Sequence, residues 1–322
     1  MDQGSLSRGN KNGSADALRD ALVRCDRTLG AIGPVLSQLV ADSDTTLFHE
    51  EVLARVRGML DSLAERLLRH FLDASGAAQE ERVSVASLDL LTRTLGDEPA
   101  LLGHLHALAI EWRLTQRLSE RRSIERVLSP LVQKLVGSED ADLAQTAMAF
   151  LTAQARFVQA AQRMQVDPSE LPADLLHSSL TILRKTIGNH PDTRRAADLA
   201  IRHVQETYDE AKTRLGLAAA LVSRASLRKQ ALDPEAAGIA LFATALGEAS
   251  AQTREQTVLA TTEGQAVLFA VMLRAAGCDQ DRTERVLLSL YPEFSLPEGV
   301  DDLDRHRAAS LLAGDIGASA RI

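Results

Sequence analysis

Apolar residues cover most of a helical wheel drawn for the segment 140–164. Its polar side chains fall on one narrow arc, which consists of Gln145, Thr152, Arg156, Gln159 and Arg163. Because a surface helix needs only one apolar stripe, this pattern predicts a central helix that neighbouring helices surround on most sides. Ser138 is the expected N-cap. The polar arc has two interpretations: these side chains face solvent and form ion pairs, or they line a cleft.

A second long helix is predicted from Asp44 to Ala74. It contains an apolar seam at alternating spacings of three and four residues, formed by Leu53, Val56, Leu60, Leu63 and Leu67. This spacing is typical of helices that pack along one another. The seam predicts either the core of an antiparallel helical bundle or the contact of a homodimer through the 45–74 helix.

Proline and glycine divide the rest of the chain into further helices. Residues 1–13 are rich in Gly, Ser and Asn and are expected to be disordered. Gly30 and Pro34 predict two breaks in the first helical region. Further helices are expected to begin at Pro99 and Pro130, because proline is tolerated in the first turn of a helix.

The segment Asn189–Pro191 marks the expected domain boundary. It separates an irregular helical bundle over 14–188 from a second domain over 189–322. A helix is predicted from Pro191 to Ala231, with a possible interruption at Gly216. Short helices joined by tight polar loops follow, which is typical of stacked helical hairpins in a HEAT-like α-solenoid. No segment has the alternation of a strand, so the predicted fold class is all-α.

Composition narrows the range of functions. Aromatic residues make up 3% of the chain, and 36 basic against 44 acidic residues give a net charge of -8. This charge argues against general binding to nucleic acid or to anionic membranes. The apolar runs are far shorter than the roughly 20 residues of a membrane span. Cys25 and Cys278 are expected to be two buried thiols, and with no signal-peptide pattern the chain is expected to be cytoplasmic.

Histidine chemistry is the first functional hypothesis. His49 and Glu50 form the pair expected of a phospho-accepting histidine with an acidic neighbour, as in a histidine phosphotransfer module; an exposed histidine at a helix end is the alternative. His104 and His106 lie two residues apart and point to different sides of a helix, so they cannot share a metal ion. The common metal, nucleotide and hydrolase motifs are missing from the sequence, and we expect neither a metal nor a cofactor.

A basic stripe is formed by Arg113, Arg117 and Arg121, which are spaced four residues apart. Guanidinium groups bind carboxylates and phosphates through forked hydrogen bonds. The stripe, together with Arg156, is therefore a candidate site for a partner protein or an anionic ligand. Glutamates interleave with these arginines, so an exposed face with many salt bridges is the alternative interpretation.

Loose helical patterns occur at Val127–Leu131, Ala153–Phe157 and Glu170–His177. Together with the stretch from Thr262 to Leu290, they resemble an uncharacterised bacterial family of all-helical, HEAT-like proteins, known only as a domain of unknown function. The resemblance covers about residues 101–290. It implies a helical fold and a bacterial cytosolic setting, and it supplies no active-site residues.

These features lead to three hypotheses for the function. The first is a non-enzymatic adaptor that binds another protein, with bacterial signalling as its setting. The second is histidine phosphotransfer by His49, with Glu50 as its helper. The third is a helical protein that binds an anionic ligand at the arginine stripe.

Overall fold

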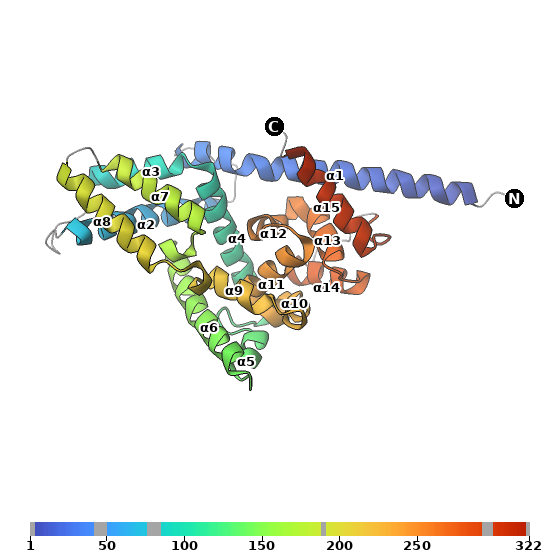
Figure 1. The fold of residues 1–322 in the computed structure, drawn as a ribbon. Coiled ribbons are helices and arrows are strands. Elements are labelled where there is room, and N and C mark those ends of the chain that lie inside the picture. The colour runs from blue at the N-terminus through green and yellow to red at the C-terminus, as the bar shows by residue number, and fades with distance from the viewer. Residues whose placement is uncertain (1–3, 42–49, 76–84, 188–190, 292–298, 320–322) are drawn as a thin grey trace. The chain divides into compact units, whose positions relative to one another are not determined.

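The structure of the protein is a computed structural model that describes residues 4–41, 50–75, 85–187, 191–291 and 299–319. Within these ranges all regular structure is helical, which confirms the predicted all-α fold class (Figure 1). The helices are α1 (Gly4–Ala41), α2 (Glu50–Ser75), α3 (Val85–Gly96), α4 (Pro99–Arg122), α5 (Pro130–Val136), α6 (Ala141–Gln162), α7 (Ala173–Thr186), α8 (Pro191–Thr207), α9 (Arg214–Val222), α10 (Ala225–Ala231), α11 (Pro234–Ser250), α12 (Arg254–Ala260), α13 (Ala266–Ala275), α14 (Gln280–Leu290) and α15 (Arg305–Ser319), with short 3-10 helices η1 (Pro168–Glu170), η2 (Glu210–Lys212) and η3 (Glu263–Gln265).

The chain forms two compact units, each built from separate stretches of the sequence. The first unit comprises Met1–Ala31, Leu114–Lys134 and Val222–Ile322, and the second comprises Ile32–Arg113 and Leu135–Leu221. Ile187 and Pro191, the described residues on either side of the expected boundary, both belong to the second unit. The arrangement of helical hairpins as a solenoid stays a prediction. None of the described helices has an apolar stretch long enough to cross a bilayer.

The core of the second unit is organised around α2. This helix packs most extensively along α8 and also contacts α3 and α7 (Figure 1). The five residues of its predicted apolar seam are all buried: Leu53, Val56, Leu60, Leu63 and Leu67. The seam therefore forms the core of a helical bundle, which is the first of its two interpretations. Asp44, where the helix was predicted to start, lies outside the described residues.

Helix α11 is the most enclosed element of the first unit. It contacts α10, α12, α13 and α14, and every residue from Ile239 to Gly247 is buried. Asp233 caps its N-terminus, and Pro234 follows at a position where proline is tolerated. Gly238 interrupts the helix with a φ of 74°, a conformation that favours glycine. The hydroxyl of Ser129 donates to the carbonyl oxygen of Ala237 at 2.8 Å, so this carbonyl is satisfied at the kink.

Helix α6 is not the surrounded helix that we predicted. Only Ala147, Phe150, Gln154, Phe157, Val158 and Ala161 are buried. The side chain of Met148 is 48% exposed, and Ala149 is exposed beside it. The prediction was wrong because alanine is counted as apolar although its small side chain tolerates exposure to water. The N-cap also differs, since the carboxylate of Asp140 rather than Ser138 accepts from the amide of Leu143.

Two other predicted helix boundaries were wrong. Helix α1 continues through Gly30 and Pro34, because buried side chains such as Leu22 and Leu36 on either side of the proline offset its cost. It begins at Gly4, within the segment for which we expected disorder.

The second difference concerns the helix predicted from Pro191 to Ala231. The chain instead forms α8, η2, α9 and α10. After α8 ends, the hydroxyl of Tyr208 donates to the carbonyl oxygen of Leu171 at 2.9 Å. A Cβ atom at Gly216 would lie 2.0 Å from the carbonyl oxygen of Glu210, so only glycine permits this close approach of α9 to η2.

Candidate functional site

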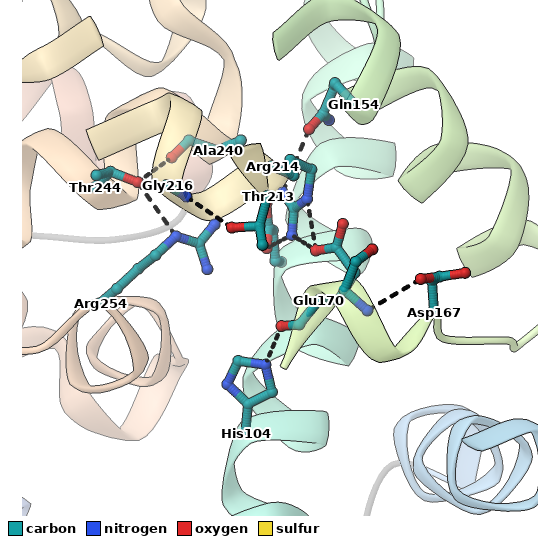
Figure 2. Close-up of polar contacts among 12 residues, drawn as sticks. His104, Gln154, Asp167, Glu170, Thr213, Arg214, Gly216, Ala240, Thr244 and Arg254 are labelled. Carbon is teal, nitrogen blue, oxygen red and sulfur yellow. Dashed lines mark hydrogen bonds and ion pairs between the residues drawn. The ribbon is translucent and has the colours of Figure 1, made fainter. Parts of the chain in front are cut away.

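A buried ionic cluster lies at the centre of the second unit. Its cation is Arg214, the first residue of α9, which is 1% exposed. The guanidinium donates to both carboxylate oxygens of Glu111, at 2.6 and 3.2 Å, and its Nε donates to Glu170 at 2.8 Å. A further hydrogen bond of 3.3 Å reaches the amide oxygen of Gln154 (Figure 2). Both carboxylates are buried as well, so the three charges of the cluster are satisfied by hydrogen bonds within the protein rather than by water.

The cluster connects four helical elements of the unit. Glu111 belongs to α4, Gln154 to α6, Glu170 to η1 and Arg214 to α9. The guanidinium carbon of Arg214 also lies 3.7 Å from the ring centroid of Phe157 on α6, within the range of a cation–π contact. Removing one partner from a buried group of this kind leaves an uncompensated charge. The cluster therefore fixes α4, α6, η1 and α9 relative to one another.

The charge of Arg214 does not respond to pH near neutrality. Burial by itself lowers the pKa of its guanidinium, but the attraction of Glu111 and Glu170 outweighs this effect and raises the pKa above its ordinary value. Stability that depends on the charged arginine is lost only as the pH rises through that raised pKa. This lies above any pH at which proteins are handled, so Arg214 keeps its charge throughout.

The two histidines of α4, His104 and His106, are largely enclosed by the fold. His104 is buried, and its Nε2 lies 2.8 Å from the carbonyl oxygen of Glu170, to which a protonated Nε2 donates (Figure 2). Burial lowers the pKa of His106 to about 4, and its Nδ1 has no hydrogen-bond partner among the described residues. His106 is therefore neutral at neutral pH. Among the residues that the structure describes, no group of histidine, cysteine and carboxylate side chains has the geometry of a metal site.

A pocket of about 660 Å³ opens beside the cluster. Its walls come from α6, from the turn that includes η1, and from the segment between the end of α8 and α9, and all of its lining residues belong to the second unit. The charged lining residues are Arg66, Arg156, Arg163, Lys212 and Arg214 against Asp167, Glu170 and Asp209. Five cations face three anions, so the lining carries a net charge of +2 in a chain whose net charge is -8.

Most of these charges are already engaged. Arg66 pairs with Asp167 at 3.0 Å, and Lys212 pairs with Asp209 at 2.9 Å. Arg214 is bound to the buried carboxylates described above. Arg156 and Arg163 differ, because their side chains are exposed and form no ion pair or hydrogen bond with any described residue. These two guanidinium groups account for the excess positive charge of the pocket.

Most of the polar arc predicted on α6 lines a cleft, which was the second of its two interpretations. All five of its residues are exposed, and four of them line the pocket: Thr152, Arg156, Gln159 and Arg163. Gln145 is exposed but does not line it. The arc thus marks the accessible wall of a cleft, although the rest of α6 is not wrapped by neighbours.

The predicted arginine stripe is divided between the two units. Arg113 is half-buried in the second unit, whereas Arg117 and Arg121 belong to the first. The guanidinium of Arg117 lies 5.0 Å from the ring centroid of Tyr291, and Arg121 is exposed. Of the four arginines that we expected to bind a partner, only Arg156 lines the pocket.

The two residues of the phosphotransfer hypothesis lie where a described range of the chain begins. His49 lies outside the described residues, and Glu50 is the exposed first residue of α2. Phosphorylation of His49 therefore stays a prediction. Cys25 and Cys278 are buried and form no disulfide, as expected, and burial raises the pKa of the Cys278 thiol to about 11.

The chain matches no protein-family model, no curated protein and no solved structure. The resemblance to a bacterial HEAT-like family accordingly stays a prediction. Inferences about function rest on the geometry of the pocket and of the cluster beside it.

Proposed function

We propose that this chain is a non-enzymatic adaptor that binds another protein, and that the pocket of the second unit is its recognition site. The observation that carries the proposal is the pair Arg156 and Arg163, which is exposed and unpaired in a pocket whose other charges are engaged. Free guanidinium groups on a concave surface favour binding to carboxylate or phosphate. A cytosolic setting, within bacterial signalling, belongs to the same proposal and is supported by two buried cysteines that form no disulfide.

The protonation states in the pocket support binding rather than acid–base catalysis. A hydrogen bond from Lys212 lowers the pKa of Asp209. Burial, together with the charges of Glu210 and Asp174, raises the pKa of Tyr208 to about 12. General acids and bases work best when their pKa lies near the operating pH. These groups keep one protonation state around neutral pH, as suits the recognition of charge.

The walls of the pocket are held in place before any partner arrives. Arg214 binds Glu111, Gln154 and Glu170, and so connects α6 and η1, which line the pocket, to α4 and α9. Arg55 on α2 donates to the carbonyl oxygen of Ala161 at 2.8 Å, which fixes the C-terminal end of α6. A preorganised site loses less conformational entropy on binding than a flexible one.

The proposal is tested by affinity purification with three forms of the full chain. The wild type is compared with R156A/R163A and with the control R93A/K185A, which removes two exposed charges of the second unit outside the pocket. We expect wild type and control to recover the same protein, which is then identified, purified and shown to bind directly by calorimetry. Loss of that binding in R156A/R163A alone supports the proposal. Equal binding by all three forms contradicts it.

A small anionic ligand is the second candidate occupant of the pocket. The volume of about 660 Å³ lies within the range of small-molecule sites, and the net charge of the lining is +2. This alternative keeps the third sequence-based hypothesis but moves the site from the arginine stripe to Arg156 and Arg163. It predicts that phosphate, pyrophosphate or a dicarboxylate raises the melting temperature of the wild type and not of R156A/R163A.

A further inference from the structure

We infer that the occupant of the pocket is an acidic peptide segment of the partner, whose carboxylates pair with Arg156 and Arg163. This inference rests on the proposed function and names the chemistry that the partner must present. The charge of the site is its first support. The net charge of the lining is +2, and both excess cations belong to exposed side chains, Arg156 in α6 and Arg163 at its C-cap.

The spacing of the two arginines favours an extended anionic ligand. They lie seven residues apart, which is two turns and about 10 Å along the axis of α6. One small anion satisfies a single guanidinium fork without spanning this distance. In an extended peptide, carboxylates that point the same way lie two or four residues apart, about 7 or 13 Å, and these spacings bracket the distance between the two arginines.

The lining between the two arginines also suits a peptide. Gln159 lies on the same arc between them, and its exposed side chain makes no hydrogen bond with a described residue, so its side-chain amide is available to a peptide backbone. Apolar surface is provided by Ala149, Ala153, Ala160 and Leu217, which line the pocket and are at least partly exposed. A peptide that carries short apolar side chains between its carboxylates fits both features.

The inference is tested with a defined probe, a fluorescein-labelled peptide in which glutamate alternates with alanine over twelve residues. Its binding to the full chain is measured by fluorescence anisotropy, with a matched peptide of glutamine and alanine as control. We expect the glutamate peptide to bind wild type and R93Q/K185Q with the same affinity. Binding to R156Q/R163Q should be weaker by about tenfold, the effect of two exposed charge-assisted pairs, and the glutamine peptide should bind none of the three.

A charge reversal gives a positive readout that a misfolded variant cannot produce. The variant R156E/R163E should lose the glutamate peptide and gain binding to a peptide of alternating lysine and alanine. Equal affinity of the glutamate peptide for wild type and R156Q/R163Q overturns the inference, because the attraction would then not involve the two arginines. Binding of inorganic phosphate to the wild type, with no binding of the glutamate peptide, overturns it as well and assigns the pocket to a small anion.

The adaptor function and the acidic peptide segment are contradicted by different results. If a purified partner depends on Arg156 and Arg163 while the glutamate peptide binds no form of the chain, the acidic segment is wrong and the adaptor function stands. If recovery of the partner does not depend on these arginines, the proposed function itself fails.

Discussion

Helices α6 and α11 look alike in sequence and differ in the structure. Both are rich in alanine and in larger apolar residues, and both carry an aspartate as N-cap. Twelve of the seventeen residues of α11 are buried, against six of the twenty-two of α6. Helix α11 is therefore enclosed within the first unit, whereas α6 buries one side and leaves the other accessible.

The difference shows what the polar residues of each helix do. The hydroxyl of Thr244 in α11 is buried, donates to the carbonyl oxygen of Ala240 and accepts from Nε of Arg254 in α12, so it serves the packing of the core. In α6, Gln154 is on the buried side and bonds Arg214, while the charged residues Arg156 and Arg163 remain on the accessible side. An enclosed helix forms core, but a one-sided helix can both hold a scaffold and present a site.

The largest expected effect comes from placing a charge on each helix in turn. Ala243 in α11 is 1% exposed, whereas Ala149 in α6 is exposed. We expect A243E to lower the free energy of unfolding by about 4 kcal/mol or more, because a carboxylate would be buried without a partner. A149E should change it by no more than about 0.5 kcal/mol. Urea denaturation measures both, and similar losses in the two variants would remove the distinction between the helices.

The buried cluster gives the next largest effect. R214M leaves Glu111 and Glu170 buried without their cation, and we expect a loss of about 3–5 kcal/mol in the free energy of unfolding. The triple variant R214M/E111Q/E170Q removes all three charges and should recover much of that stability. A triple variant no more stable than R214M would show that shape, rather than charge, holds α6 to its neighbours.

Acid should lower the stability of the second unit through His106 on α4. The residues that follow it in the helix, from Ala107 to Trp112, are all buried. The pKa of His106 is lowered from 6.5 to about 4 in the folded chain. The unfolded chain therefore takes up this proton first, and stability is lost as the pH falls from about 6.5 to about 4.

The measurement for His106 is a difference between two proteins, since carboxylates also titrate in this range. Relative to H106Q, the wild type should lose up to about 3 kcal/mol of unfolding free energy between pH 7 and pH 4. A constant difference across this range would mean that His106 is accessible to water in the folded state.

The smallest effect is expected at the site itself. R156Q/R163Q should change the free energy of unfolding by less than about 0.5 kcal/mol, because neither side chain has a partner in the described structure. Thermal and urea denaturation of the variant beside wild type provide the measurement. A loss of several kcal/mol would show that the two arginines belong to the scaffold and are not free for a ligand.

Local sequence signals predicted the helices well. Pro99 and Pro130 begin α4 and α5, as expected. Proline in the first turn acts through its own backbone geometry, so its effect can be predicted without tertiary structure. The breaks expected at Gly30 and Pro34 were wrong because buried side chains around the proline outweigh this local preference.

The buried cluster could not be assembled from the sequence. Arg214 and Glu111 are 103 residues apart, and Arg214 and Glu170 are 44 apart, so no local spacing relates them. One signal was present, since Glu111 stands between Ile110 and Trp112 in an otherwise apolar stretch of α4. A lone carboxylate there indicates that a buried cation must meet it, but it does not identify which one.

The pocket was partly predictable. Periodicity placed Thr152, Arg156, Gln159 and Arg163 on one arc, and the structure confirms that they share one wall. The lining also includes Tyr208 and Lys212, which flank and belong to η2, the element that Gly216 approaches closely. That approach is a tertiary contact, which helical periodicity does not report.

The most direct test of the account is thiol labelling of A149C and A243C in the full chain. The native Cys25 and Cys278 are buried, so the introduced thiol dominates the reaction with an aromatic disulfide reagent. We predict that A149C on α6 reacts at close to the rate of a free thiol and that A243C on α11 reacts only after unfolding. Protection of A149C to the same degree as A243C would mean that α6 is covered, and would contradict both the pocket and its proposed role.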